Sequence, residues 1–472
     1  MARSSPGNDV ANGYTNGHGN GKKPGITVFS GGTAANSLVD VFKRIAKRKR
    51  AQLTYVIPIS DNGGSSSELI RFIGGPSVGD IRSRLVRLMP TREGDGHEDD
   101  PELSALRKFF EHRLSSDKTQ AKDEWRDIVE STHPIWKSIS SPKKELIRSI
   151  LNTLNLEIVK RTRPPESTFN FTRASIGNLF LTGARIFSGS LESAIYLLSV
   201  ICSIPRSVSV LPAINSNFTH HISASLTNGT IITGQANISH PLKFSSQPDA
   251  DSTDEFEDAN LPGAHPELRR PNIAFDKNEE EELPARISRV WYINPYGEEI
   301  TPQVNPKVIG ALESSSAVIF SIGSLFTSIV PNLVLRGVGK AILNPNIRHK
   351  ILLLNSKQDR ETGPSTDPMS ARDFVAAIAE ACGPKPIKPN SQMVIQPTGP
   401  HLKIAEETFH KYVSHLIYLE GEGVPEVNTE ELEEVGIKCV KVDGVLFQDG
   451  KTFMMRYDEV ALGKALTEIM DS

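Results

Sequence analysis

The fold of this chain is set by one stretch, Gly25-Ile-Thr-Val-Phe-Ser-Gly-Gly-Thr-Ala-Ala-Asn36. Its apolar and β-branched residues predict a strand over Ile26–Ser30, and the apolar spacing that follows predicts a helix over Ser37–Lys49. The turn Gly31-Gly32-Thr33 joins the two, so main-chain N–H groups converge at the positive end of a helix dipole. Glycine suits this turn because a Cβ would keep a ligand away from the main chain. The stretch therefore predicts a site for a phosphate-bearing ligand, without saying which one.

The same order of strand, polar turn and helix recurs along the chain. A second strand, Leu53–Ile59, ends in Ser60-Asp-Asn-Gly-Gly-Ser65, and two later apolar strands are Ala317–Ser321 and Lys350–Leu354. An Asn228-Gly229 turn between two β-type runs predicts a hairpin. Apolar strands that alternate with helices predict a mostly parallel sheet covered by helices on both faces. The expected fold class is α/β with a doubly wound sheet.

Composition divides the chain into an ordered body and several less regular segments. Residues 1–23 are rich in Ser, Gly and Asn and predict a disordered tail. Residues 91–165 carry dense charge with intermittent apolar stripes, which predicts an inserted helical subdomain. Residues 241–285 are acidic and Pro-rich and predict a disordered surface insertion, with a regulatory docking segment as the alternative. The main α/β domain is expected over 24–400, with 401–472 as a C-terminal α/β extension packed on it.

The overall composition restricts the classes of partner. The 472 residues carry a formal net charge of −3, which gives no global case for nucleic acid or an anionic membrane. Three Cys, with no CxxC and no His pair at ligand spacing, argue against a disulfide framework or a zinc site and favour a reducing compartment. No stretch reaches membrane-spanning length, and the N-terminus lacks a signal-peptide core. We therefore expect a cytoplasmic protein without a nucleic-acid or membrane partner.

Ligands of a doubly wound sheet bind at the carboxyl ends of its strands. Four strand ends here carry small polar residues, and we expect them to line one shared crevice. Two amides set in apolar runs are further candidates for a ligand contact or a main-chain clamp. The candidate ligand-binding residues are Gly31, Gly32, Thr33, Asn36, Asn62, Gly63, Gly64, Ser65, Arg82, Asn178, Asn237, Gly323, Ser324, Thr327, Ser328, Asn332 and Asn355. The alternative is that these are ordinary strand-to-helix turns, which often contain Gly and Ser.

Two acidic residues, Asp61 and Asp80, each stand beside glycine-rich main chain. Two carboxylates facing one phosphate would repel it unless a hard cation lay between them, so the pair predicts an Mg²⁺ site with a catalytic role. The alternative for Asp80 is a cap on the helix expected from Ile81. Arg82 is expected either to pair with a ligand phosphate or to be a solvated surface arginine.

Common nucleotide-binding and nucleophile patterns are missing. The turn after the first strand lacks the GxGxxG spacing of a dehydrogenase, although Asp61 follows the second strand where a ribose-binding acid would stand. The chain has no Walker GxxxxGK[ST] motif, and the Gly323-Ser324 turn lacks the GxSxG form. The residues therefore suit a phosphate without specifying a classical nucleotide fold.

Six sequence blocks follow one another along the chain. They are Ser30-Gly-Gly-Thr33, Ser60-Asp-Asn-Gly-Gly-Ser-Ser66, Gly79-Asp-Ile-Arg82, Gly177-Asn-Leu-Phe180, Gly234-Gln-Ala-Asn-Ile-Ser239 and Gly323-Ser-Leu-Phe-Thr-Ser-Ile-Val-Pro-Asn-Leu333. Together they resemble the CofD/YvcK family, which joins the 2-phospho-L-lactate transferases of deazaflavin-coenzyme synthesis to the YvcK-type gluconeogenesis factors. The resemblance covers roughly residues 25–90, 170–240 and 287–382, and leaves the segment 91–165 and the acidic insertion outside.

The resemblance implies a Rossmann-like domain whose strand-end loops bind a nucleotide-linked ligand. In the transferase branch this ligand is a GDP-linked phospholactate with Mg²⁺ held by aspartates, and the matching positions are Asp61 and Asp80. In the YvcK branch it is a nucleotide sugar such as UDP-N-acetylglucosamine, and the protein is a regulator of carbon metabolism. Asp61-Asn-Gly-Gly64 stands where the transferase branch tends to carry consecutive acids, so this chain is closer to the YvcK form.

Two functions are expected on this basis. The first is transfer of a phosphate-linked group, of the 2-phospho-L-lactate transferase kind, from a nucleotide-linked donor with Mg²⁺. The second is non-catalytic binding of a nucleotide sugar or a dinucleotide by a regulatory protein. The expected partner is in both cases a small nucleotide-linked molecule, and a homodimer is left open.

Overall fold

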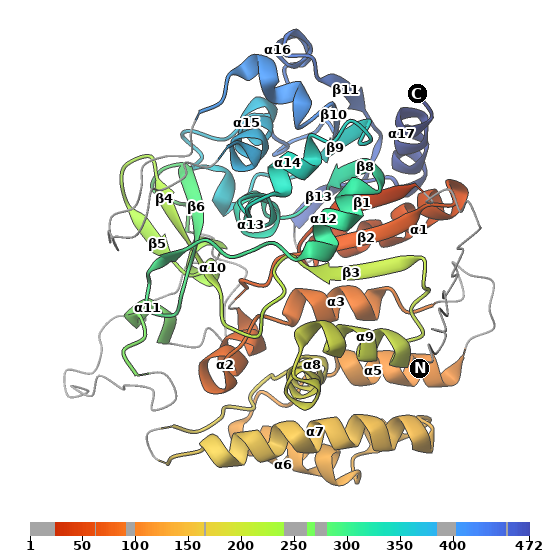
Figure 1. The fold of residues 1–472 in the computed structure, drawn as a ribbon, viewed down its shortest axis with the longest axis vertical. Helices are drawn as coiled ribbons and strands as arrows, with labels where there is room; N and C mark the ends of the chain where they lie inside the picture. The colour runs from red at the N-terminus through yellow and green to blue at the C-terminus, as the bar shows by residue number, and fades with distance from the viewer. Residues whose placement is uncertain are drawn as a thin grey trace, which may run out of the picture.

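The computed structural model describes residues 24–61, 63–90, 100–164, 167–239, 262–269, 281–384, 403–449 and 452–472. Its centre is a seven-stranded sheet with the order β11-β10-β9-β8-β1-β2-β3, in which all neighbouring strands are parallel (Figure 1). The strands are β1 (Gly25–Phe29), β2 (Gln52–Ile57), β3 (Val208–Pro212), β8 (Ser315–Phe320), β9 (His349–Leu353), β10 (His415–Tyr418) and β11 (Lys438–Lys441). The mostly parallel α/β fold expected from the sequence is confirmed.

The strand order reverses between β1 and β8. From β1 the chain adds β2 and β3 on one side, and from β8 it adds β9, β10 and β11 on the other. Every residue of β1 is buried, which explains its continuous apolar run. Its one polar side chain, Thr27, shares a buried 2.8 Å hydrogen bond with Ser315 at the start of β8. In sheets of this kind the crevice at such a reversal is where ligands bind.

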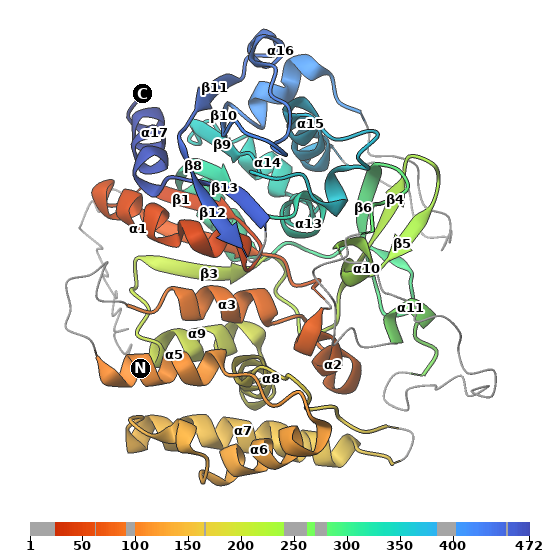
Figure 2. The same cartoon turned by 180° about the vertical axis from the view of Figure 1, so that it is seen from behind.

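Helices cover both faces of the sheet. On the face turned to the viewer in Figure 1, α12 (Pro306–Glu313) packs on β1, β8 and α14 (Val338–Ile342). On the face turned to the viewer in Figure 2, α1 (Val39–Arg48) packs on β2 and on the last helix, α17 (Glu459–Asp471). α1 is amphipathic: it buries Val41, Phe42 and Ile45 and leaves Lys47 exposed.

A largely helical segment separates β2 from β3 (Figure 1). Its helices are α2 (Gly64–Ile73), α3 (Gly79–Arg87), α5 (Pro101–Glu111), α6 (Lys118–Glu130), α7 (Ser141–Arg161), α8 (Ile176–Ser188) and α9 (Leu191–Ile201). α6 and α7 lie farthest from the sheet, and α8 packs between α7 and α9. Asp100 and Asp117 accept main-chain N–H groups at the starts of α5 and α6, which explains where these helices begin. The helices expected within 91–165 are thus present in its described part.

A second, antiparallel sheet lies beside the main one (Figure 1). Its order is β5-β4-β6-β7, with β4 (His221–Leu226), β5 (Ile231–Thr233), β6 (Ile287–Ile293) and β7 (Glu299–Ile300). The expected hairpin is β4–β5. Tyr292 on β6 donates a 3.0 Å hydrogen bond to the carbonyl of Pro331, which joins this sheet to the main body. Further described helices are α10 (Gln235–Ser239), α11 (Pro266–Arg269), α13 (Val330–Leu333), α15 (Ala371–Cys382) and α16 (Thr429–Glu434).

Several elements differ from the sequence expectation. The strand β3, the helices α2 and α12, and the hairpin of β12 (Gly444–Asp449) and β13 (Thr452–Tyr457) were not expected. The turn expected over 323–332 instead contains a π-helical turn, Leu325–Ile329, followed by α13. The helix expected over 334–343 is shorter and begins at Val338, because Gly337 adopts a φ of 99° before it.

Some expectations fall outside the described residues: the tail 1–23, Asn62, and most of the acidic insertion 241–285. Of that insertion the structure describes 262–269, with α11, and the segment from 281 onward. None of the described helices combines the length and the apolar character that a membrane span requires.

Candidate ligand-binding site

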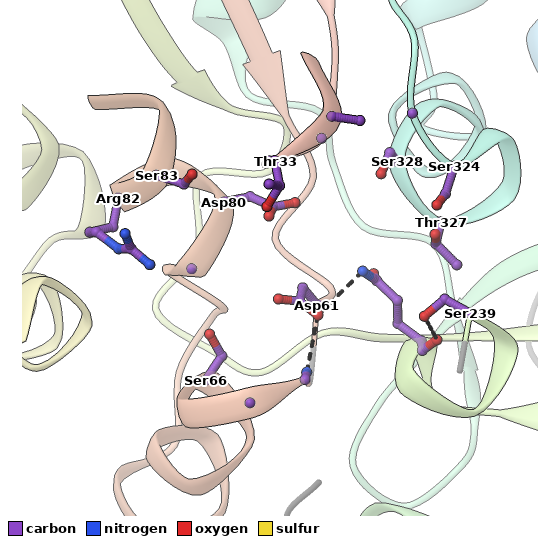
Figure 3. A pocket seen from close by; sticks show the side chains of 18 of the residues that line it. Thr33, Asp61, Ser66, Asp80, Arg82, Ser83, Ser239, Ser324, Thr327 and Ser328 are labelled. Carbon is purple, nitrogen blue, oxygen red and sulfur yellow. Dashed lines mark hydrogen bonds between the residues drawn. The ribbon is translucent and has the colours of Figure 1, made fainter. Parts of the chain in front are cut away.

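A polar cavity of about 380 Å³ opens at the carboxyl ends of β1 and β8, where the strand order reverses. Its wall is formed by the turns after β1, β2 and β8 together with the starts of α2, α3 and α10 (Figure 3). Three segments that are far apart in sequence therefore meet here, represented by Gly32, Asp61 and Ser324. The shared crevice expected at the strand ends is present in the geometry.

The turn after β1 needs glycine because two side chains lie against its main chain. A Cβ on Gly32 would overlap the carboxylate of Asp80, and a Cβ on Gly31 would overlap the hydroxyl of Ser328. The N–H of Gly32 donates a hydrogen bond to Asp80. Glycine is thus required at both positions because the side chains of Asp80 and Ser328 lie too close to the main chain to leave room for a Cβ.

Asp61 and Asp80 lie at the centre of the cavity in Figure 3. Burial raises the pKa of Asp61 to about 7, and the negative charge of Asp80 acts in the same direction. Burial also raises the pKa of Asp80, although the charges of Arg84 and Arg82 oppose this effect. Burial thus raises the proton affinity of both carboxyl groups in one wall, and such a pair forms a site that favours a bound cation.

The structure excludes the capping alternative for Asp80. Helix α3 begins at Gly79, so Asp80 lies within its first turn, and the residue at the cap position is Val78. No side chain caps this helix. The carboxylate of Asp80 instead faces the turn after β1.

Asp61 is held by two donors. Its Oδ1 accepts a 3.0 Å hydrogen bond from the N–H of Gly63 and a 3.4 Å hydrogen bond from Nε2 of Gln235. Oε1 of Gln235 in turn accepts a 3.0 Å hydrogen bond from the buried hydroxyl of Ser60. Gln235 belongs to α10, so the small antiparallel sheet and its helix fix the orientation of Asp61 in the main domain.

A buried arginine, Arg84, holds the turn after β1 by hydrogen bonds to it. Arg84 is fully buried; its guanidinium donates to the carbonyls of Gly31 and Ala35 and to the Ser30 hydroxyl at 3.1–3.2 Å. The guanidinium also lies over the ring of Tyr55, 4.6 Å from its centroid. Arg84 therefore fixes the turn and supplies positive charge near Asp80, without lining the cavity itself.

The turn after β8 is held by a buried acid. Oε2 of Glu361, a side chain that is 1% exposed, accepts 3.0 Å hydrogen bonds from the N–H groups of Phe326 and Thr327. Its Oε1 lies 2.6 Å from the hydroxyl of Thr327. The two amide hydrogen bonds lie at the start of the π-helical turn, a form often found at functional sites. On the other side, Asn355 exchanges hydrogen bonds of 3.0 and 2.9 Å with the main chain of Gly323.

The structure brings most of the candidate residues together. The cavity is lined by Gly31, Gly32, Thr33, Asp61, Gly63, Gly64, Ser65, Asp80, Arg82, Asn178, Gly323, Ser324, Thr327 and Ser328. Four candidates lie outside its lining and hold the main chain or a neighbouring side chain instead. Asn36 donates to Ser83, Asn237 to the carbonyl of Thr233, Asn332 to the carbonyl of Ser328, and Asn355 to the carbonyl of Gly323.

Other lining residues were not among the candidates: Ala34, Ala35, Ser66, Gly79, Ser83, Arg113, Gln235, Ala236, Ser239 and Ile322. Ser66 and Gly79 adjoin candidate turns, so their proximity in sequence was a signal. Gln235 lies in the sequence block Gly234–Ser239, in which the sequence indicates only Asn237 as a candidate. Arg113 follows α5 and reaches the cavity only through tertiary packing.

The donor set fits a hard cation. Mg²⁺ is commonly bound by one or two carboxylates together with phosphate oxygens and water, and Asp61 and Asp80 can supply the carboxylates. Among the described residues no cluster of three or more His, Cys, Asp or Glu could hold a metal ion. An ion at the aspartates would therefore take its remaining ligands from a bound phosphate and water.

Fold and cavity together define a doubly wound, Rossmann-like α/β protein with a polar site at its topological switch point. The sequence model of the family described as "2-phospho-L-lactate transferase CofD" matches residues 26–445. The chain belongs to this family, as its six sequence blocks had indicated.

Two relatives extend the likeness over nearly the whole chain. An uncharacterized protein of Saccharomyces cerevisiae, YNL011C, is 40% identical over 448 residues, which cover 88% of this chain and 95% of that protein. The gluconeogenesis factor of Bacillus subtilis is 22% identical over 453 residues, covering 95% of this chain and 99% of its own length.

Solved structures show the same fold. Two crystal structures of protein BH3568 from Bacillus halodurans, one described as a member of the UPF0052 family, have a TM-score of 0.56 with this chain. They are 17% and 19% identical to it, and each comparison covers 94% of this chain and 99% of the other. At this identity the likeness concerns the fold alone.

Proposed function

We propose that this cavity binds a nucleotide-linked phosphate ligand, with Mg²⁺ at Asp61 and Asp80, and that the protein transfers a phosphate-linked group from that ligand. The observation that carries the proposal is the convergence of two glycine-containing turns, after β1 and β8, on a pair of carboxylates at the switch point. Main-chain N–H groups at such turns suit phosphate oxygens. The match to the family described as a 2-phospho-L-lactate transferase supports the same chemistry.

The described lining of the cavity suits catalysis by orienting the bound ligand rather than by a protein nucleophile. Its side chains include no His, Cys or Lys, and its two acids, Asp61 and Asp80, are the residues proposed to hold Mg²⁺. Transfer to phosphorus does not require a protein nucleophile, because orientation and neutralisation of charge can account for most of the rate. A bound Mg²⁺ would supply neutralisation at the phosphate oxygens. The turns after β1 and β8 would hold the donor in place.

A second candidate function is non-catalytic binding of a nucleotide sugar or dinucleotide by a regulator. Two observations favour it: the described wall has no His, Cys or Lys that could act as a nucleophile or base, and the Bacillus subtilis relative is named a gluconeogenesis factor. Both functions use the same cavity. They differ in whether the bound ligand turns over.

A thermal-shift screen tests the shared part of the two proposals. The panel contains nucleoside diphosphates, nucleotide sugars and dinucleotides, each with and without Mg²⁺. A compound that binds the folded protein raises the melting temperature by mass action. We expect at least one nucleotide-linked compound to do so, with a larger shift when Mg²⁺ is present. A panel without any shift would contradict both functions.

The variant Asp80→Asn separates metal binding from the rest of the site. It keeps the size of the side chain and removes one of the two charges that face the cation, so we expect at least a tenfold weaker Mg²⁺ dependence of ligand affinity. Turnover of the ligand identified by the screen, followed by phosphorus NMR, should fall in parallel if the protein is a transferase. Unchanged affinity and turnover would show that the aspartates hold no metal.

A further inference from the structure

One end of the cavity carries two arginines that the proposed phosphate turns do not use. Arg82 lies in α3 and Arg113 lies just after α5, and both line the cavity. In Figure 3, Asp61 and Asp80 lie between Arg82 on one side and Ser324, Thr327 and Ser328 on the other. Arg82 and Arg113 are called the arginine pair below.

The orientation of Arg82 is fixed by its surroundings. Its Nε donates a 3.2 Å hydrogen bond to Oδ1 of Asn178, and the amide of Asn178 donates to the hydroxyl of Ser65 at 3.0 Å. A Cβ on Gly177 would stand 2.7 Å from Cγ of Arg82, so this glycine makes room for the arginine stem. Among the described residues, Nε is the only guanidinium nitrogen of Arg82 with a hydrogen-bond partner, so its two outer nitrogens can donate to a ligand.

Arg113 is brought to the same place by main-chain pairing. The segment after α5 pairs with residues just before α8: Arg113 forms an antiparallel bridge with Ser175, and the N–H of Leu114 donates to the carbonyl of Ala174. Nη1 of Arg113 donates a 3.3 Å hydrogen bond to the carbonyl of Arg173. The helical segment that the family resemblance did not cover thus contributes a cation to the cavity.

The two cations oppose each other electrostatically. Burial and, to a smaller extent, the charge of Arg113 lower the pKa of Arg82 to about 10, while the charges of Glu111 and Asp80 act against this. In the part of the chain described, neither guanidinium forms a carboxylate ion pair within 4 Å. An anion placed between them would relieve the repulsion and accept charge-assisted hydrogen bonds from both.

We propose that the arginine pair binds a second acidic group of the ligand, a carboxylate or a phosphate, in addition to the phosphates at the glycine turns. This inference rests on the proposed function and narrows its ligand class to nucleotide-linked compounds with an additional acid. It also assigns a binding role to the helical segment between β2 and β3. Arg113 would then determine specificity, while the turns after β1 and β8 bind the shared nucleotide part.

Two matched pairs of probes test the inference by calorimetric titration. UDP-glucose and UDP-glucuronate differ by a carboxylate, and NAD⁺ and NADP⁺ differ by a phosphate. We expect the wild type to bind at least one acid-bearing probe about tenfold or more tightly than its partner. A preference in the uridine pair identifies a carboxylate, and a preference in the nicotinamide pair identifies a phosphate.

Three variants complete the experiment. Arg113→Gln should bind the preferred acidic probe about tenfold or more weakly than the wild type does. Its affinity for the other member of the same probe pair, which lacks the acid, should fall less than twofold. That second affinity also shows that the variant is folded. Arg113→Lys should lose part of this affinity, because a point charge replaces a two-pronged donor. The control Arg173→Gln changes the same charge at an exposed neighbour outside the lining, and should alter neither probe more than twofold.

The outcomes separate the two proposals. If probes bind but the wild type shows no preference within either pair, or if Arg113→Gln weakens both members of a pair equally, the arginine pair binds no second acid and the proposed function stands. If none of the four probes binds the wild type, the arginine-pair inference falls, and the proposed function falls with it only if the thermal-shift panel also gives no shift.

Discussion

At the scale of single residues, Gly32 shows how tightly the site is packed, because a Cβ at this position would lie against the carboxylate of Asp80. Because a Cβ would overlap Asp80, the substitution Gly32→Ala must move either the turn or the acid. We expect it to weaken binding of any ligand found in the screen at least tenfold, since displacements of about 1 Å can cost a hundredfold in such sites. Titration calorimetry measures the change, and circular dichroism checks the fold.

The matched control is Gly463→Ala in α17. A Cβ there would make only ordinary contact, 3.9 Å from Val41. Ligand affinity should be unchanged in this variant. Wild-type affinity in Gly32→Ala would show that the close approach of Asp80 to the turn is irrelevant to the site.

Glu361 makes the stability of the turn after β8 depend on pH. Burial raises its pKa from 4.5 to about 8, and the charge of Asp359 acts in the same direction. The hydroxyl of Thr327 can accept as well as donate, so the neutral carboxyl also finds a partner. The folded protein then binds more protons than the unfolded chain between these two values. The contribution of Glu361 is fully present below about pH 4.5 and is lost as the pH rises through about 8.

The variant Glu361→Gln resembles the neutral acid at every pH. We therefore expect the wild type to lose stability relative to this variant between about pH 5 and pH 9, by on the order of 2–4 kcal/mol at most. Denaturant unfolding at both pH values measures the difference. A difference that is constant with pH, or that grows in favour of the wild type at high pH, would show that Glu361 is ionised throughout.

At the scale of elements, one short helix is held against its neighbour by a glycine. A Cβ on Gly339 in α14 would overlap the carbonyl of Cys382, the last residue of α15. Gly339→Ala should therefore destabilise the protein by about 1–3 kcal/mol, as overpacking does in other cores. Gly310→Ala in α12 is the control, because nothing lies within 4 Å of its Cβ position.

The two alanines should act in opposite directions. In the open position, Gly310→Ala should stabilise the protein by about 0.5–1 kcal/mol through the higher helix propensity of alanine. Chemical denaturation of both variants gives the comparison. Equal effects would mean that helix propensity, rather than the contact with α15, governs position 339.

The elements that could be predicted are those whose pattern is local. β1, β2, β8 and β9 were predicted because buried parallel strands form apolar runs that stop at polar turns. β3 was missed because its Ser209 interrupts the run and its first residues are only half buried. The β12–β13 hairpin carried a usable signal, Asp449-Gly450, between two β-type runs.

In the site, too, the residues that could be predicted are those with a local sequence pattern. Glycine turns and the two aspartates were predictable, because strand order alone brings the strand ends together. Asn36, Asn237, Asn332 and Asn355 support the turns, and sequence cannot tell a residue that supports a wall from one that faces a ligand. Gln235 and Arg113 reach the cavity from elements outside the main sheet; Gln235 had a signal in the block Gly234–Ser239, whereas only tertiary packing reveals Arg113.

At the scale of the whole molecule, the C-terminal residues are part of the central structure. β10 and β11 extend the sheet, and α17 returns to pack on α1, where Arg44 pairs with Glu459 at 3.0 Å. Tyr457 adds two buried hydrogen bonds, of 2.8 and 2.9 Å, to the carbonyls of Leu354 and Ile417. The end of the chain should therefore unfold together with the beginning.

The variant Leu466→Ala tests this coupling. Leu466 is fully buried in α17, so truncating it should destabilise the protein by about 2–5 kcal/mol. Scanning calorimetry should show the main transition moved to lower temperature. Val460→Ala, at a side chain that is 78% exposed, should change stability by less than about 0.5 kcal/mol. A new early transition with the main one unmoved would show that the C-terminal part unfolds independently.

The position of β1 has a consequence for how the protein is made. Its contact with β8 joins Thr27 to Ser315, 288 residues later in the chain. At about 5–20 residues per second, the ribosome needs roughly 15–60 s to deliver that partner. Throughout this interval one edge of a largely apolar strand is unpaired and can template pairing with another nascent chain. Translational stalling between β1 and β8 should therefore favour aggregation over folding.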